Sequence, residues 1–407
     1  MATKILLVLF SCFLLACRDA VVDRDRPLAE VRDSAGIRIV ENRRLAETSR
    51  LGWRVGPEPS VSIGALDGEE PYLLHWATAT MLPDGRIAVA NAGSNEVRLF
   101  DRSGDHLATW GGQGEGPGEF SFLSDVAPWP GDSLVAWYSH GLSISVFDAS
   151  GNFGRSFSLQ SAQTESWQRP RPVAARPDGT ILSLNAPEAA DTAVVEIWDG
   201  DGTLGASLGV HPNWTVFIET NERGNRELSR PAYGSRLVVA PWGELVAIGH
   251  TSRYEIKAFR GDGALARIVR RDDVLRTPRQ ADLEPYVEAQ MSMLTESPYP
   301  AELLPDARRS LESTPLAETF PAFSSVVADA TGNLWVREYD YPREERPAPL
   351  WSVFDPEGRI LGLVETPREL AIRRIGEDYV LGWTRDDYGV EYIQVWPLDR
   401  SAGGNQM

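Results

Sequence analysis

Short apolar strands separated by turns recur along most of the chain. Each repeat has an apolar strand, a turn with glycine, a second strand, a loop, and a third strand that ends in an aromatic residue. Self-similarity of this kind indicates a repeat architecture, in which each unit buries its apolar faces against its neighbours. The closing aromatic residues are Phe100, Phe147, Trp198, Phe259, Phe354 and Trp396.

A turn motif completes every unit except the last. Asp directly follows four of the aromatic residues, and glycine stands four residues after the first five of them. An Asp side chain caps its own turn and glycine adopts a positive φ, so the motif predicts a hairpin into a fourth strand. Six copies predict an all-β fold, a six-bladed β-propeller of four-stranded antiparallel blades. The glycines are Gly104, Gly151, Gly202, Gly263 and Gly358.

The sixth copy is incomplete, because Arg400 takes the place of the glycine. A missing outer strand would leave an exposed edge, which closed propellers avoid by taking a strand from the other terminus. We expect residues 53–63 to supply that strand and to close the ring, with residues 36–42 packing nearby. The propeller is then expected to cover residues 34–400, followed by a disordered tail at 401–407.

One segment, residues 272–320 between the fourth and fifth units, departs from the strand pattern. It predicts one helix with Pro285 in its first turn and a second, shorter helix from near Pro305 that stops at Pro315. The insertion is interpreted either as a lid over the channel mouth or as a packed cover for apolar surface. The helical face of the first helix comprises Tyr286, Val287, Gln290, Met291 and Leu294.

The N-terminus carries Lys4, an apolar run over residues 5–13, and Leu14-Leu15-Ala16-Cys17. The run is too short to span about 30 Å of hydrocarbon, so residues 1–16 are predicted to be a signal peptide. The last four residues resemble the lipobox of bacterial lipoproteins, which implies that Cys17 is lipidated and tethers the chain to a membrane. Arg18 follows the cysteine where the inner-membrane retention signal has Asp, so the resemblance favours the outer membrane, facing the periplasm. Residues 17–33 are charged and aperiodic and predict a flexible tether.

Charge and cysteine content exclude several classes of protein. The 407 residues have a formal net charge of −18, which repels phosphate backbones, so nucleic acid is not an expected partner. The two cysteines are Cys12, inside the predicted signal peptide, and Cys17. The sequence therefore predicts neither a disulfide framework nor a thiolate zinc cluster.

Three segments together resemble a known family. They are Ser34-Ala35-Gly36-Ile37-Arg38-Ile39-Val40-Glu41-Asn42, Gly111-Gly112-Gln113-Gly114-Glu115-Gly116-Pro117-Gly118-Glu119-Phe120, and Arg385-Asp386-Asp387-Tyr388-Gly389-Val390-Glu391-Tyr392. The chain resembles the bacterial six-bladed β-propeller lipoproteins, relatives of the NHL-repeat propellers. The resemblance implies the fold and hardly restricts the activity, because most members are known as predicted binding or scaffold proteins. The glycine run lacks the Lys-Ser/Thr ending of a phosphate-binding loop and is interpreted as a tight turn between blades.

The NHL-like order predicts which face binds a ligand. The first strand of each blade lines the channel, and the loop between the second and third strands shares a face with the connection from the previous blade. We expect the site on this loop face, since loops on a rigid scaffold carry most binding residues. Trp214 and Tyr388 lie in expected loops, and such aromatics with Arg suit a sugar or peptide. The candidate ligand-binding residues are His75, Asn91, His140, Asn185, His250, Glu338 and Arg385.

The leading hypothesis is a lipid-anchored envelope protein that acts without catalysis, as a binding or scaffold protein for a protein, peptide or glycan. No cofactor is predicted. The alternative is a metal-dependent hydrolase or lyase in which a divalent ion at the channel mouth activates water, because imidazole and oxygen groups map there. The sequence has no His-Glu-x-x-His motif and no complete nucleophile elbow. A third hypothesis is a purely structural envelope component.

Overall fold

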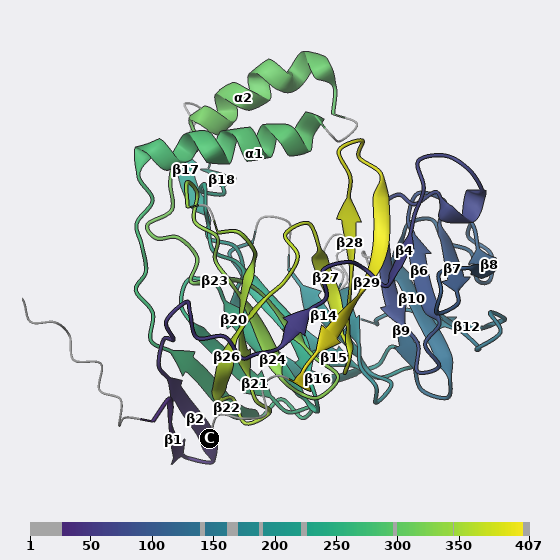
Figure 1. Cartoon of the computed structure of the whole chain (residues 1–407), viewed down its shortest axis with the longest axis horizontal. Coiled ribbons are helices and arrows are strands. Elements are labelled where there is room, and N and C mark those ends of the chain that lie inside the picture. The colour runs from purple at the N-terminus through teal and green to yellow at the C-terminus, as the bar shows by residue number, and fades with distance from the viewer. Residues whose placement is uncertain are drawn as a thin grey trace, which may run out of the picture.

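The protein forms a six-bladed β-propeller, as predicted (Figure 1). The structure is a computed structural model that describes residues 27–138, 143–160, 170–186, 190–220, 226–295, 299–344 and 346–401. The predicted signal peptide 1–16 and Cys17 lie outside the described residues.

Blades 1 to 3 are regular four-stranded antiparallel sheets that follow one another along the chain. Blade 1 has β5 (Ala77–Met81), β6 (Ile87–Asn91), β7 (Glu96–Phe100) and β8 (His106–Gly111); blade 2 has β9 (Leu123–Trp129), β10 (Ser133–Tyr138), β11 (Ile144–Phe147) and β12 (Phe153–Phe157); blade 3 has β13 (Arg171–Ala175), β14 (Ile181–Asn185), β15 (Thr192–Trp198) and β16 (Leu204–Pro212).

Blades 4 and 6 differ because N-terminal strands add to their edges, whereas blade 5 is a four-stranded sheet like the first three. Blade 4 has β19 (Leu237–Trp242), β20 (Leu245–His250), β21 (Glu255–Phe259) and β22 (Leu265–Arg271), extended by β2 (Ile37–Asn42) and β1 (Ala29–Ser34); blade 5 has β23 (Phe323–Ala328), β24 (Leu334–Glu338), β25 (Leu350–Phe354) and β26 (Ile360–Glu365); blade 6 has β27 (Ala371–Ile375), β28 (Tyr379–Arg385) and β29 (Glu391–Asp399), completed by β3 (Arg54–Val55) and β4 (Val61–Ile63).

The first strands of the blades form the inner ring. β5, β9, β13, β19, β23 and β27 each contact the first strand of the next blade, and β27 contacts β5 again. Six apolar cores lie between the blades, and each combines residues of two neighbouring sheets. The closing aromatics supply much of this packing, since Phe100 and Phe354 are completely buried at the ends of their strands. Burial is therefore an interblade property that no single blade achieves alone.

The outer turns use the chemistry that the motif predicts. Asp101 accepts hydrogen bonds on Oδ1 from the backbone N–H groups of Ser103 and Asp105, at 2.8 and 3.0 Å. Gly358 adopts a φ of +87°, and a Cβ there would lie 2.5 Å from a methyl carbon of Val269. The glycine at this position thus serves both the turn and the close approach of the neighbouring blade.

The N-terminal strand closes the ring, as expected. In Figure 1 the purple β4 runs beside the yellow β29, and Val61 and Ile63 pair with Val395 and Ile393 in an antiparallel register. This pairing supplies the fourth strand that the sixth unit lacks. Blade 6 is therefore built from both ends of the propeller.

The expected position of residues 36–42 is wrong. The strand β2 does not lie beside the closing strand but pairs in parallel with β22, on the outer edge of blade 4. Its last residue, Asn42, donates from Nδ2 to the carbonyl oxygens of Arg270 and Gly358, both at 3.0 Å, and accepts from the backbone N–H of Ile360 at 2.8 Å. The alternation of apolar residues predicted the strand but not the blade to which it adds. The buried Asn42 amide fixes β2 on the edge of blade 4.

The chain from β2 to β4 forms a strap, defined here as residues 37–63, along the outer edges of three blades. After β2 it runs past blade 5, where the backbone N–H of Leu51 donates to the carbonyl of Leu363 at 2.9 Å. It then reaches blade 6 through β3 and β4. Upstream, β1 begins at Ala29, inside the range 17–33 that was predicted to be a flexible tether.

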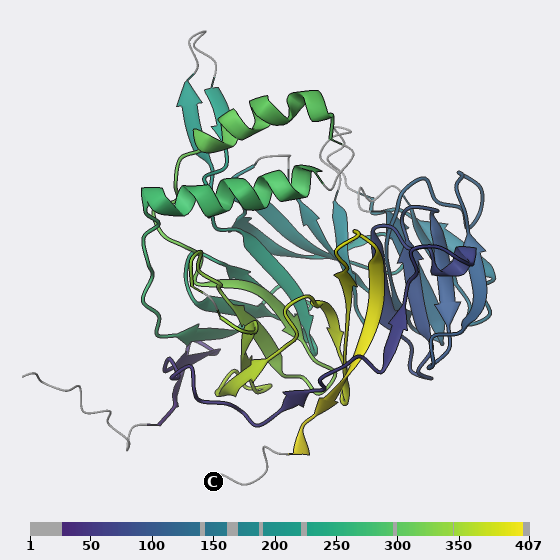
Figure 2. The same cartoon turned by 45° about the horizontal axis from the view of Figure 1, so that its top comes forward.

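The insertion between blades 4 and 5 is helical, as predicted. It contains η2 (Gln280–Asp282), α1 (Leu283–Thr295), η3 (Ala301–Leu303) and α2 (Leu304–Glu312); a further short helix, η1 (Glu70–Tyr72), precedes blade 1. The two helices lie over one end of the ring, near the hairpin of β17 (Phe217–Thr220) and β18 (Arg226–Ser229) (Figures 1 and 2). Among the described residues, none of the helices has the length and apolarity that crossing a membrane requires.

Arg400, the residue in place of the sixth glycine, locks the closed ring. Its guanidinium donates to the Asp329 carboxylate at 2.9 Å and to the Gly376 carbonyl at 2.7 Å, and it lies 4.4 Å from the ring centroid of Trp53 in the strap. Burial alone would raise the pKa of Asp329, but hydrogen bonds from Trp335 and Asn333 and the charge of Arg400 lower it below its ordinary value. One side chain thus joins blades 5 and 6 to the strap.

Replacing Arg400 by Met should lower the free energy of unfolding by about 3 kcal/mol, because the buried Asp329 carboxylate loses its counter-ion. The measurement is guanidinium-induced unfolding monitored by tryptophan fluorescence. Arg359→Met is the control, since the side chain of Arg359 is 49% exposed and its contact to Asp355 is 3.6 Å long, so a loss under about 1 kcal/mol is expected. Equal losses in the two variants would contradict the lock.

Candidate ligand-binding site

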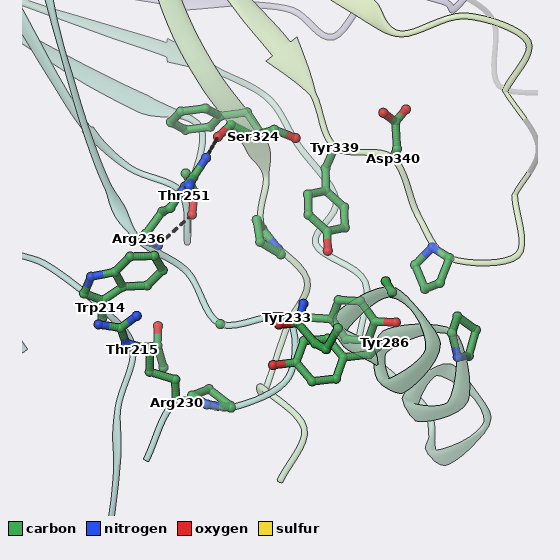
Figure 3. Close-up of a pocket in the computed structure, with 18 of the residues that line it drawn as sticks. Trp214, Thr215, Arg230, Tyr233, Arg236, Thr251, Tyr286, Ser324, Tyr339 and Asp340 are labelled. Atoms are coloured by element: carbon green, nitrogen blue, oxygen red, sulfur yellow. Dashed lines mark hydrogen bonds between the residues drawn. The ribbon is translucent and has the colours of Figure 1, made fainter. Parts of the chain in front are cut away.

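A cavity of about 760 Å³ lies between the helical insertion and the loop face of the propeller (Figure 3). Four parts of the chain meet there: the connection that leads into blade 4, the end of β20, the helix α1, and residues 321–342 of blade 5. Each of the four includes residues of a loop or connection that was expected to lie on the loop face. The volume is typical of sites for small ligands.

Aromatic rings form one wall of the cavity. Tyr233 packs against Tyr286 of α1 and against Phe320, with ring centroids 5.4 and 4.9 Å apart. Phe320 in turn contacts Tyr339 and Tyr341, at 5.7 and 5.4 Å. Tilted and edge-to-face contacts of this kind favour a rigid aromatic surface.

The phenols of this wall are neutral at physiological pH. Burial, helped by the charge of Asp282, raises the pKa of Tyr233 to about 12. Burial also raises the pKa of Tyr286 and of Tyr339 above the ordinary tyrosine value. Tyr233 donates its hydroxyl hydrogen to the carbonyl of Asp282 at 2.6 Å. Among the described residues, no hydrogen-bond partner is found for the hydroxyls of Tyr286 and Tyr339, which leaves both available to a ligand.

Two arginines form the other wall. Arg230 lies over the indole ring of Trp214, with its guanidinium carbon 4.0 Å from the ring centroid. Arg236 donates to the carbonyl of Ser324 at 3.1 Å, and its backbone N–H donates to the hydroxyl of Thr251 at 2.9 Å. Figure 3 shows Trp214, Arg230 and Arg236 on the side of the cavity away from Tyr286 and Tyr339. This wall is cationic.

Asp340 is the acidic residue of the lining, and two arginines outside the lining compensate its negative charge. Its two carboxylate oxygens accept from Arg337 and Arg346, each at 3.0 Å. The cavity therefore combines neutral phenols with two guanidinium groups.

Backbone hydrogen bonds hold the insertion against the connection into blade 4. Ala232 donates to the carbonyl of Pro315 at 2.8 Å and accepts from the N–H of Ala317 at 3.0 Å. The buried side of α1 presents Val287 and Met291 to Ala232. The insertion is thus a packed cover, and Tyr286 and Gln290 of the same helix line the cavity.

The predicted residues His75 and Asn91 lie together in blade 1, outside the cavity lining. The Asn91 side chain accepts from the backbone N–H of His75 at 2.8 Å and donates to the carbonyl of Leu73 at 3.1 Å. Asn91 is 2% exposed, whereas His75 is exposed and stacks on Trp76 at 4.4 Å. The amide of Asn91 fastens the segment that leads into β5.

His250 ends the second strand of blade 4, as Asn91 ends the second strand of blade 1. Its Nε2 lies 3.2 Å from the carbonyl oxygen of Asn213, and its Nδ1 lies 2.8 Å from the hydroxyl of Ser252. Burial lowers the pKa of His250, so the imidazole is neutral. Asn185 ends the second strand of blade 3 and is half-buried, whereas His140 lies outside the described residues.

Glu338 forms an ion pair between blades 4 and 5. It accepts from both guanidinium nitrogens of Arg271, at 2.6 and 2.9 Å, and from the hydroxyl of Ser352 at 2.7 Å. Arg271 also lies over the ring of Tyr254, 3.7 Å from its centroid. The side chains of Arg271 and Glu338 are 3% and 12% exposed, so Glu338 acts as an interblade contact.

Arg385 likewise takes part in a contact between blades 6 and 1. It donates to Glu391 at 2.8 Å, and the other oxygen of Glu391 accepts from the backbone N–H of Ala77 at 3.0 Å. Arg385 lines a second cavity, of about 460 Å³, that lies between blade 6 and the strap. The ligand-binding role expected for these residues stays a prediction, and none of the described ones lines the cavity under α1.

Within the described part of the chain, no three His, Cys, Asp or Glu side chains gather closely enough to hold a metal ion. Of the groups expected to converge on the channel, Asn91 and His250 bond to the connection that leads into their own blade, and Glu338 bonds to Arg271 of blade 4. The metal-dependent alternative therefore has no assembled ligand set among these residues.

The glycine run at 111–120 is a tight turn, as interpreted. Phe120 donates its backbone N–H to the carbonyl of Gly112 at 2.9 Å, and Glu119 accepts from the N–H of Gly116 at the same distance. Phe120 is buried against Phe147 of blade 2. The run seats one blade on the next. The element that follows it is the strand β9, not a helix.

Sequence reasoning missed most of the cavity residues. Trp214 was identified as a loop aromatic near Arg, and it does line the cavity, whereas Tyr388 is 84% exposed and does not. Tyr286 was assigned to one face of a predicted helix, without a role in a site. Arg230 and Tyr339 were not considered, although an Arg-Pro pair and a Tyr-Asp-Tyr-Pro run in predicted connections were available signals.

Comparisons with known proteins found distant similarity to solved structures and nothing else. No protein-family model matches the chain, and no curated protein matches it. A protein described as exported, from Bacteroides fragilis, is 12% identical, covers 89% of this chain and 99% of its own, and has a TM-score of 0.46. A member of the DUF4221 family from Bacteroides vulgatus is 9% identical, with coverages of 86% and 99% and a TM-score of 0.47.

A gluconolactonase from Xanthomonas campestris is also similar in shape. It is 13% identical, with coverages of 80% of this chain and 87% of its own, and a TM-score of 0.40. The strand order of the structure itself defines a six-bladed β-propeller with an inserted helical cover. Because one fold serves many functions, the function is proposed from the cavity.

Replacing Glu338 by Gln should lower the free energy of unfolding by about 3 kcal/mol, because the buried Arg271 loses its closer counter-ion and keeps only Asp273, which lies 3.9 Å away. The double variant Glu338→Leu with Arg271→Met should recover most of the loss, since apolar groups replace both charges. Chemical unfolding measures both. If Glu338→Gln leaves stability unchanged, Glu338 is not an interblade contact and is free for a ligand.

Proposed function

We propose that the protein is a binding protein of the bacterial cell envelope, which holds a peptide or glycan in the cavity under α1 without transforming it. The carrying observation is the cavity itself, which has an aromatic wall, a cationic wall and free hydroxyl groups. Apolar surfaces with a few oriented polar groups are typical of sites that recognise small ligands.

The chemistry of the lining supports binding rather than catalysis. No described lining residue is a histidine or cysteine, and the one carboxylate, Asp340, is held by two arginines. The hydroxyls of Thr215 and Thr251 accept backbone N–H groups, and neither contacts a base in the described structure. Nucleophilic catalysis needs a nucleophile and a base within hydrogen-bond reach.

Lipidation of Cys17 would anchor the propeller to a membrane. The proposed location is the outer membrane, with the propeller facing the periplasm. The lipobox-like Leu14-Leu15-Ala16-Cys17 motivates this proposal. The chain joins the propeller through β1, on the outer edge of blade 4. An anchor attached there leaves the cavity free to receive a ligand.

Filling the cavity tests the proposed site. Ala289→Trp adds an indole to the lining surface of α1, so binding of glycans or peptides on printed arrays should fall to background while the unfolding temperature stays within a few degrees of wild type. Glu284→Trp is the control, because it adds the same ring to the exposed part of α1 outside the lining. Array signals that survive Ala289→Trp would place binding elsewhere.

The anchor is tested separately. When the full chain is produced in a Gram-negative bacterium, Cys17→Ser should move it from the membrane fraction to the soluble periplasmic fraction, because no acyl chains remain to hold it. Cys12→Ser, a change inside the predicted signal peptide, should leave the protein in the membrane fraction. Membrane retention of the Cys17→Ser protein would show that lipidation of Cys17 is not what holds it.

A further inference from the structure

The charge of the cavity is opposite to that of the protein. The chain has a formal net charge of −18, yet Arg230 and Arg236 both face the cavity, and Asp340 is already paired with two other arginines. Among the described residues, no carboxylate forms an ion pair with Arg230 or Arg236. A cationic pocket on an acidic protein attracts anionic groups, whereas a neutral ligand gains no charge–charge attraction there.

The arrangement of these two arginines suits the binding of an anionic group of a ligand. The Trp214 ring covers one face of the Arg230 guanidinium, which leaves its N–H edge for hydrogen bonds. Arg236 is positioned through Thr251 and Ser324. A positioned guanidinium binds a carboxylate or phosphate through two parallel N–H donors, and these charge-assisted bonds are the strong ones.

The other polar side chains of the lining that have no described partner can form hydrogen bonds with ligand hydroxyls. Tyr286 and Tyr339 contribute phenols without a partner among the described residues, and burial keeps both protonated. Gln290 of α1 adds an amide to the same lining, also without a described hydrogen bond. Groups that both donate and accept, set on aromatic rings, match a ligand that carries several hydroxyls on an apolar ring.

The backbone of the lining disfavours an extended peptide. A peptide strand binds by pairing with a row of main-chain N–H and C=O groups. Four lining residues are prolines, which have no N–H to donate. They are Pro231, Pro285, Pro321 and Pro342.

We infer that the cavity under α1 binds an acidic saccharide, whose carboxylate or phosphate lies against the cationic wall of Arg230 and Arg236 and whose ring lies against the wall of Tyr233, Tyr286 and Tyr339. The inference rests on the proposed binding function and specifies its ligand. The volume of about 760 Å³ accommodates a short oligosaccharide.

Three sugars that share one ring and differ at carbon 6 test the inference: D-glucose, D-glucuronate and D-glucose 6-phosphate. Saturation-transfer NMR at low ionic strength gives the affinity of each. We expect at least one anionic sugar to bind about tenfold or more tightly than glucose and to weaken as salt is added. The preferred anion distinguishes a carboxylate from a phosphate ligand.

Variants connect the affinity to the two arginines. Arg230→Gln and Arg236→Gln should each weaken the anionic sugar by about tenfold or more, and Arg230→Lys should recover part of the loss because it restores the charge. Arg253→Gln is the control, since it removes a positive charge from the same face at an exposed residue outside the lining, and affinity should stay unchanged. Unfolding temperatures confirm that each variant is folded.

Equal affinity for glucose and the anionic sugars, or anionic binding that survives both Gln variants, overturns the inference. So does the absence of binding up to about 10 mM of either anionic sugar. If Ala289→Trp still abolishes array binding in these cases, the proposed binding function stands and only the ligand class is wrong. If array binding is absent or survives Ala289→Trp, the binding function and the ligand class both fail.

Discussion

The pairing of β4 with β29 is the contact on which the rest of the structure depends. Ile63 of the strap joins Ile393 of blade 6 in a core that also contains residues of blade 1, so this pairing completes the last interblade interface. Asn42 and Arg400 reinforce it from the two ends, the first between blades 4 and 5 and the second between blades 5 and 6. With the ring closed, the loop face becomes a rigid frame, and the helical cover has a fixed surface to pack against.

Two kinds of polar residue share that face and do different work. Residues at the ends of second strands, such as Asn91, His250 and Glu338, bond to the preceding connection or blade, and they hold the ring together. Residues in the connections themselves, such as Trp214 and Arg230, face the cavity. The side chains that hold the ring together thus stand at the ends of second strands, and the residues that line the cavity lie in the loops just beyond them and in the connections between blades.

The fold was largely predictable because its signals are local. The capped turn at Asp101 and the missing sixth glycine both appear within a few residues of sequence, and they led to the correct number of blades and the correct closing strand. The edge chosen by β2 depends on Asn42 meeting two blades, which no local pattern reveals. The cavity was missed for the same reason, since Tyr233, Tyr286 and Tyr339 come from three separate segments that meet only in the folded protein.

The order of the strands along the chain has a consequence for when the protein can fold. β4 is synthesised before any blade, and its partner β29 is synthesised after almost all of them. Until β29 is available, the apolar faces of the first and last blades have no partner, so a nascent chain cannot reach the closed state. Contacts of such long sequence separation form late and slowly. The strap thus delays completion of the ring until the whole chain is present, whichever side of a membrane that happens on.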